Sequence, residues 1–131
     1  MKKTIQVVGA IIENEKKEIL CALRSTQMSL GNYWEFPGGK VEPSETLAQT
    51  IEREIQEELG CRVRFVEVFR KNLHEYDTFN VELHGVKCQL IQGLPQAKEH
   101  AALLWLKREN LLSLQWAPAD LPIVEALLQT F

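Results

Sequence analysis

The chain has 131 residues, 45% of them hydrophobic, and a formal net charge of −3 at pH 7. This length suits a single domain over residues 1–131, and the apolar content is sufficient for a hydrophobic core. The mild negative charge argues against a nucleic-acid polymer or an anionic membrane as the main partner, so local cations would have to hold any anionic substrate.

The first elements in chain order are predicted to be strands. Residues 5–12 (IQVVGAII) are almost all apolar or β-branched, which predicts a strand buried on both faces. A polar turn at 13–17 and a second strand at 18–24 predict a hairpin. A loop over 25–33 then leads to a short extended segment, Trp34-Glu35-Phe36, and to Pro37-Gly38-Gly39.

Residues 46–59 form the clearest predicted helix, because Leu47, Ile51, Ile55 and Leu59 make one apolar stripe and Gly60 provides a stop. Strands are predicted at 62–70, 79–91 and 101–106. A second helix is predicted at 119–130. Its inward residues are expected to be Leu121, Val124, Leu127 and Leu128. Strands interleaved with two helices indicate an α/β fold with a mixed sheet sandwiched between helices.

The cysteines predict a reducing environment. Cys21, Cys61 and Cys88 are odd in number, have no CxxC spacing and adjoin apolar residues, so we expect buried free thiols. The first residues run directly into a strand-like segment without a signal-peptide pattern. We therefore expect a cytoplasmic protein.

Three glutamates on the first predicted helix point to a metal. Glu54, Glu57 and Glu58 are spaced i, i+3 and i+4, so they project together. Like charges at this spacing destabilise a helix by roughly 0.2–0.5 kcal/mol per pair, and the dipole disfavours anions in the last turn. Mg²⁺, which takes oxygen ligands and is usually shared with substrate phosphates, would offset this cost. Taken alone, the cluster could also be a solvated acidic face.

The segment before the helix adds to this pattern. Gly38 and Gly39 would let the backbone approach a ligand closely or adopt a positive φ. The Gly38 carbonyl could then be a fourth oxygen ligand, and Lys40 would place a cation close to phosphates. A lone Gly-Gly pair would equally suit an ordinary turn.

Residues 39–61 fit one long signature. Its fixed positions are Gly39, Glu45, Arg53, Glu54, Ile55, Glu57, Glu58, Gly60 and Cys61. This spacing resembles the Nudix box, G-x5-E-x7-R-E-U-x-E-E-x-G-U, in which U is an apolar residue. Cys61 stands where Ile, Leu or Val is usual, and cysteine also behaves as a small buried hydrophobe.

The resemblance to the Nudix hydrolases implies the α/β fold described above and hydrolysis of a nucleoside diphosphate linked to another group. It implies Mg²⁺ as cofactor, with Mn²⁺ as a substitute. By position, the metal ligands would be Glu54, Glu57, Glu58 and the Gly38 carbonyl. Arg53 would orient these carboxylates, and Glu45 would support them as a structural partner.

Segments outside the box are similar to the MutT-like nucleoside triphosphate pyrophosphohydrolases, especially the CTP pyrophosphohydrolase branch. They are GAII at 9–12, LR at 23–24, WEFPGGK at 34–40 and APADLP at 117–122. This resemblance implies cleavage of a triphosphate to a monophosphate and pyrophosphate. Arg24, with Gly39 and Lys40, would bind the substrate phosphates. Glu99 matches a glutamate that approaches the metal and serves as a candidate general base.

Asp120 matches the position that reads the base, although it also suits the start of a helix. An ionised carboxylate only accepts hydrogen bonds, so it would favour N4 of cytosine or the N1–N2 edge of guanine. Cytosine nucleotides are therefore expected as substrates, with 8-oxo-guanine nucleotides also in range. Trp34 and Phe36 are candidates for stacking, although aromatic residues close to a core more often serve packing.

Two other functions stay open on the sequence. A Nudix hydrolase of dinucleoside polyphosphates or nucleotide sugars is one, and Tyr76 lies close to a tyrosine typical of the diadenosine polyphosphate group. A non-catalytic ligand-binding module is the other, but such modules usually lose the box carboxylates. The expected partner is a small nucleotide rather than a nucleic-acid polymer or a membrane. The chain could act as a monomer or a homodimer.

Overall fold

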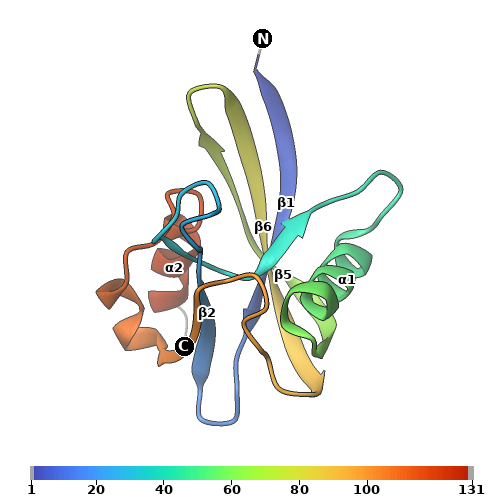
Figure 1. Cartoon of the computed structure of the whole chain (residues 1–131), viewed down its shortest axis with the longest axis vertical. Coiled ribbons are helices and arrows are strands. Elements are labelled where there is room, and N and C mark those ends of the chain that lie inside the picture. Colours follow the sequence, from blue (N-terminus) through green and yellow to red (C-terminus); the bar gives the residue numbers. More distant parts are fainter. Residues whose placement is uncertain (1, 130–131) are drawn as a thin grey trace.

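The computed structural model describes residues 2–129, with strands at the centre and a helix on either side (Figure 1). Its elements are β1 (Lys3–Ile12), β2 (Glu18–Leu23), β3 (Trp34–Glu35), β4 (Gly38–Lys40), α1 (Leu47–Leu59), β5 (Arg62–Glu75), β6 (Phe79–Gln92), β7 (Ala102–Lys107), the 3-10 helix η1 (Arg108–Ser113) and α2 (Leu121–Leu128). No helix within this part of the chain is long and apolar enough to cross a membrane.

The strands form two sheets instead of the single sheet expected. The first has the order β4-β1-β6-β5 and is mixed, because β1 runs parallel to β6 and antiparallel to β4. The second is antiparallel with the order β3-β2-β7. The expected hairpin of β1 and β2 is limited to a bridge between Glu13 and Ile19. Since β4 and β6 occupy both edges of β1, β2 has no edge left to pair with.

Burial on both faces holds for the second half of β1 only. Residues 8–12 are buried, whereas Gln6 and the residues before Ile5 are exposed. Val8 and Ala10 belong to a core with Ile51 of α1, the α1-side core, and Ile11 belongs to a second core with Val124 of α2, the α2-side core. The alternation of side chains along a strand thus places the two helices on opposite faces, which confirms the α/β sandwich.

Helix α1 begins and ends as the sequence predicts. Thr46 accepts a hydrogen bond from the Gln49 amide, and the Gln49 side chain accepts one from the Thr46 amide, so a capping box starts the helix. Gly60 ends it in the left-handed conformation, with φ 68°. Ile51 and Ile55 are fully buried, which confirms the predicted stripe.

Helix α2 differs from the prediction at its start. It begins at Leu121 and buries Ile123, Val124 and Leu127, whereas Leu121 is 36% exposed and Leu128 only half-buried. Leu121 lies off the stripe that the three buried residues form at 100° per residue, so its expected inward position was wrong. The predicted end of this helix at 130 lies outside the described residues.

The β5–β6 hairpin extends further than predicted, with 14 residues in each strand. Register shifts interrupt its pairing between Phe65 and Glu67 and between Val68 and Arg70. The extension carries Tyr76 and Phe79, which lie at its turn, to the rim of the cavity described next. The hairpin therefore helps to build the site.

Candidate active site

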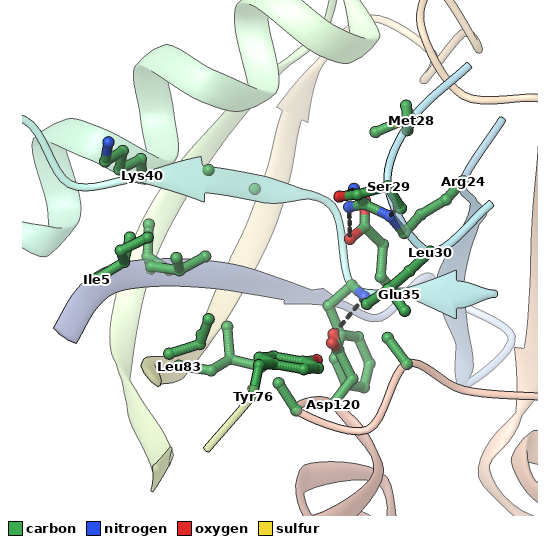
Figure 2. A pocket seen from close by; sticks show the side chains of 18 of the residues that line it. Ile5, Arg24, Met28, Ser29, Leu30, Glu35, Lys40, Tyr76, Leu83 and Asp120 are labelled. Atoms are coloured by element: carbon green, nitrogen blue, oxygen red, sulfur yellow. Dashed lines mark hydrogen bonds and ion pairs between the residues drawn. The ribbon is translucent and has the colours of Figure 1, made fainter. Parts of the chain in front are cut away.

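A cavity of about 330 Å³ is lined by residues of β1, β3, β4, α1 and β6, the loop after β2, the β5–β6 turn and the segment before α2. It contains seven of the residues expected from the sequence: Arg24, Phe36, Gly38, Gly39, Lys40, Glu58 and Asp120. Figure 2 shows Arg24, Ser29 and Glu35 gathered on one side and Tyr76 and Leu83 on another. The cavity thus joins a charged part to an apolar part.

Glu58 is the box carboxylate that reaches this cavity. Its Oε1 is buried without a hydrogen-bond partner among the described residues. Burial, and then the charges of Glu54, Glu35 and Glu99, raise the pKa of Glu58 to about 9, although a hydrogen bond from the Gly38 backbone acts in the opposite direction. A buried carboxylate surrounded by other carboxylates is the environment that a cation would stabilise.

Gly38 and Gly39 are needed because other protein atoms pack against them. A Cβ on Gly38 would overlap the Val8 carbonyl of the neighbouring strand, and a Cβ on Gly39 would overlap the Glu54 carboxylate. Neither glycine has a positive φ, so that alternative is wrong. The pair gives close approach to β1 and to Glu54.

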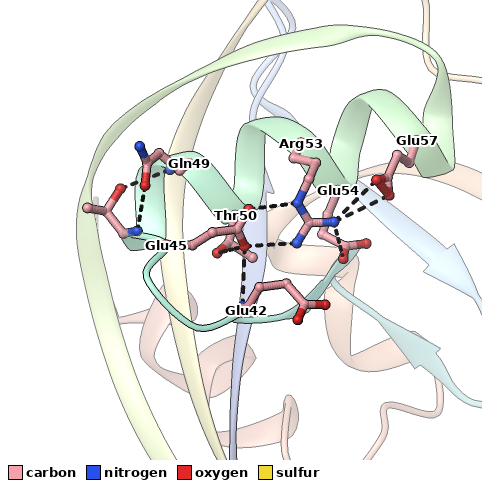
Figure 3. Close-up of polar contacts among 8 residues, drawn as sticks. Glu42, Glu45, Gln49, Thr50, Arg53, Glu54 and Glu57 are labelled. Atoms are coloured by element: carbon pink, nitrogen blue, oxygen red, sulfur yellow. Dashed lines mark hydrogen bonds and ion pairs between the residues drawn. The ribbon is translucent and has the colours of Figure 1, made fainter.

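Arg53 connects the remaining box residues (Figure 3). Its Nε and Nη2 donate to the two Glu45 oxygens at 2.8 and 2.9 Å, and its Nη1 donates to Glu54 at 3.0 Å and to Glu57 at 3.2 Å. The Arg53 hydrogen bond, and then one from Thr50, lower the pKa of Glu45 to about 2. The Arg53 guanidinium therefore holds three carboxylates in fixed relation to each other.

Within residues 2–129 no group of three or more His, Cys, Asp or Glu side chains is arranged to hold a metal ion. Arg53 already forms ion pairs with Glu54 and with Glu57. The donor set nevertheless suits a hard divalent cation, since it consists of carboxylates and includes the unpartnered Oε1 of Glu58.

Arg24 belongs to a second network, on the side of the cavity away from Tyr76 and Leu83 (Figure 2). Its Nη1 donates to Glu35 at 2.7 Å, its Nε to the Ser29 carbonyl at 2.6 Å and its Nη2 to Ser29 Oγ at 3.2 Å. The other oxygen of Glu35 lies 2.8 Å from Nε2 of His100. A guanidinium carries five N–H donors. These contacts use three, which leaves two for an anionic ligand.

Asp120 lies buried in the cavity and accepts a hydrogen bond from the Phe36 amide at 3.0 Å. It precedes α2 but makes no side-chain capping bond, so it faces the cavity and not the helix. Burial, followed by the charge of Glu35, raises its pKa to about 8. This shift runs against the expectation of an ionised carboxylate, because it favours the neutral carboxyl, which has an O–H to donate, in the free protein at neutral pH.

Two expected residues take other positions. Trp34 packs in the α2-side core and forms a backbone bridge with Trp116, away from the cavity lining. Glu99 is exposed in the loop before β7, although its charge acts on Glu58. Phe36 does line the cavity, and its ring lies 4.9 Å from that of Trp116. The structure thus separates the two aromatic candidates.

Sequence reasoning missed Glu35, His100 and Tyr76 as residues of the site. Glu35 gave one signal, because it is the sole charged residue between two aromatic ones in a segment leading to the box. Tyr76 was noted only for comparison of subclasses, and its burial and its hydrogen bond to the Ala119 backbone depend on the tertiary fold. His100 stands in a polar run that looks like an ordinary loop.

Comparison with known proteins gives matches over almost the whole chain. The model of the NUDIX domain matches residues 3–127. A CTP pyrophosphohydrolase of Escherichia coli (strain K12) is 41% identical over 126 residues, which is 96% of this chain and 93% of that protein. An 8-oxo-dGTP diphosphatase of the same strain is 32% identical over 125 residues, which is 95% of this chain and 97% of that protein.

The fold agrees equally well. The solution structure of the E. coli ORF135 protein has a TM-score of 0.87 at 40% identity and covers 98% of this chain and 91% of that one. These matches include the box at residues 39–61 and the segments on either side of it, so they confirm the resemblance drawn from the sequence. The chain belongs to the NUDIX domain family.

Proposed function

We propose that this chain is a Mg²⁺-dependent nucleoside triphosphate pyrophosphohydrolase that forms a nucleoside monophosphate and pyrophosphate. The observation that carries the proposal is the cavity itself, which joins the cations of Arg24 and Lys40 and the half-buried Glu58 to an apolar part containing Asp120. Phosphates suit the first part and a base suits the second. The printed names of the two E. coli relatives, one for CTP and one for 8-oxo-dGTP, support cytosine or 8-oxo-guanine nucleotides as substrates.

Glu54, Glu57 and Glu58 would hold the metal, together with the Gly38 carbonyl and Glu99. When bound, Mg²⁺ polarises phosphate oxygens and activates an attacking water. The two free N–H donors of Arg24 bind a phosphate. Arg53, supported by Glu45, keeps the carboxylates in position.

The base would lie between Tyr76 and Leu83, with its polar edge toward Asp120. A neutral carboxyl offers one donor and one acceptor, which complements N3 and N4 of cytosine. The same pair complements O6 and N1–H of an oxidised guanine. Asp120 alone therefore accepts both candidate bases, and the walls of the cavity decide between them.

The proposal also concerns the setting of the enzyme. We place it in the cytoplasm, where the three buried free cysteines remain reduced. It acts there on free nucleotides, not on nucleic-acid polymers, as a monomer or a homodimer.

A pyrophosphate-release screen with Mg²⁺ tests the proposal. The substrates are CTP, dCTP, 5-methyl-dCTP, 5-hydroxy-CTP, 8-oxo-dGTP, the ordinary triphosphates, ADP-ribose and diadenosine tetraphosphate. We expect pyrophosphate from cytosine nucleotides or 8-oxo-dGTP, and none after chelation of the metal. If all triphosphates are inert while ADP-ribose or the dinucleotide is cut, the proposed substrate class is wrong.

A further inference from the structure

His100 is one of three buried polar or charged residues among residues 2–129, and the other two are Thr50 and Asp120. Its side chain is 1% exposed, and its ring makes one hydrogen bond, from Nε2 to Glu35, while Nδ1 has no partner among the described residues. Because burial of an imidazole is costly, its contact with Glu35 requires a reason beyond packing.

The three residues of this network come from one end of the second sheet. Arg24 follows the last residue of β2, Glu35 ends β3, and the β2–β3 pairing sets Glu35 opposite Ala22. The amide of Ala101 donates to the Leu23 carbonyl at 2.9 Å, which extends the ladder of β2 and β7 and brings His100 to the same end. Backbone pairing therefore fixes the order Arg24, Glu35, His100.

Glu35 uses its two oxygens for two different partners, Oε1 for Arg24 and Oε2 for His100. With both oxygens engaged, the Glu35 carboxylate is fixed in orientation, and together with the Ser29 carbonyl and hydroxyl it holds the Arg24 guanidinium at the cavity. His100 does not line the cavity and does not reach a ligand there. Its action on the site must pass through Glu35.

The box contains the same arrangement. Buried Thr50 donates to Glu45 at 2.8 Å, and Glu45 in turn binds Arg53 through both oxygens. Each of the two arginines thus binds a glutamate, and a buried polar side chain forms a further hydrogen bond with that glutamate. Two buried polar residues serving the same geometry argue that the His100 contact has a positional role.

We propose that His100 is a positioning residue for Arg24: it fixes the Glu35 carboxylate, and through it the guanidinium that binds the substrate phosphates. The phosphate contact rests on the function proposed above. The positional step, from His100 to Arg24, concerns the free protein and stands independently of the substrate. Loss of the imidazole frees Glu35 to rotate and Arg24 to leave its position, which weakens substrate binding more than it slows the chemical step.

Steady-state kinetics with the triphosphate that is turned over best test this. His100→Ala should raise KM about tenfold, the size of a lost hydrogen bond to a charged group, with kcat within about twofold. His100→Gln, whose amide can donate to Glu35, should recover most of the KM. In an Arg24→Lys background, His100→Ala should add less than about twofold. His84→Ala, on β6, is the matched control and should leave KM and kcat unchanged.

A spectroscopic measurement on the substrate-free protein separates this inference from the proposed function. The Nη–H resonances of Arg24, identified by their loss in Arg24→Lys, include the N–H that donates to Glu35 and should be resolved in the wild type and in His100→Gln and broadened in His100→Ala. If His100→Ala fails to fold, Glu35→Gln replaces it and should broaden the same resonances. Unchanged resonances in a folded variant, or additive effects on KM, would overturn the proposal. A wild type that cuts no triphosphate yet shows the expected resonances would refute the function alone.

Discussion

Asp120 and Glu58 are both carboxylic acids whose pKa the fold raises, to about 8 and about 9, in the absence of a ligand. Burial is the first cause in both cases, and neighbouring carboxylates add to it. The two environments differ in the ligand that each carboxyl group suits. Glu58 is surrounded by other carboxylates and suits a cation, whereas Asp120 already accepts the Phe36 amide and faces an apolar pocket that suits a base.

Asp120 gives a pH prediction. Below a pKa of about 8 its neutral carboxyl has a donor for N3 of cytosine, and above it the ionised group has none and repels N3. Asp120→Asn keeps a donor and an acceptor at every pH. The ratio of wild-type to Asp120→Asn kcat/KM for CTP should therefore fall about tenfold between pH 7 and pH 9. Because both enzymes share the metal site, its titration cancels in the ratio. A ratio that does not change with pH would contradict the role of Asp120 in binding the base.

Glu57 gives a prediction on catalysis. It is the most exposed of the box carboxylates that Arg53 binds, so replacing it disturbs little packing. Glu57→Gln should nearly abolish pyrophosphate release while the unfolding transition changes by less than about 1 kcal/mol, because a neutral amide is a poor ligand for Mg²⁺. Glu52→Gln, also on α1, removes the same charge and should remain active. Wild-type activity in Glu57→Gln would refute the metal assignment.

The box residues were predictable because they are local. One helix sets the spacing of Glu54, Glu57 and Glu58, so their proximity follows from sequence alone. Glu35 and His100 are 65 residues apart and meet only through the pairing of β2 with β3 and β7. The raised pKa of Asp120 could not be predicted from the sequence either, because it depends on burial in the folded protein.

At the scale of elements, a specific residue fixes the position of each end of α1. The sequence predicted Gly60 as the stop, whereas the capping box of Thr46 and Gln49 at the other end is a finding of the structure. The two sheets were not signalled, because an apolar run predicts burial but carries no information on which strand will be its neighbour. The end of β5 was missed because residues 70–75 are largely polar.

The capping box predicts a stability effect. Thr46→Ala removes the acceptor for the Gln49 amide and should lower the free energy of unfolding by about 1 kcal/mol in urea titrations. Thr46→Ser retains the hydroxyl and should stay close to the wild type. Because the cap lies at the other end of the helix from Glu57 and Glu58, kcat should be preserved. A loss of activity at unchanged stability would contradict this separation.

For the whole molecule, the main electrostatic strain is the cluster of carboxylates around Glu58. Binding of a cation to the folded state should relieve it. Mg²⁺ at ten times its Kd should stabilise the protein by about 1.4 kcal/mol and raise Tm by about 5 °C. When melts with Mg²⁺ are compared with melts after chelation, Glu58→Gln should lose most of this rise in Tm and Glu52→Gln should retain it. An equal rise in both variants would place the cation elsewhere.

The two hydrophobic cores have a consequence for how such a chain can change over generations. The wall of the cavity, including Phe36, Leu83 and Ala119, belongs to the α2-side core, whereas Ile51, Ile55 and Leu59 of the box helix belong to the α1-side core. Strand β1 stands between them. Mutations can therefore accumulate on one side and redirect the choice of base, while the hydrolytic helix on the other side is inherited intact.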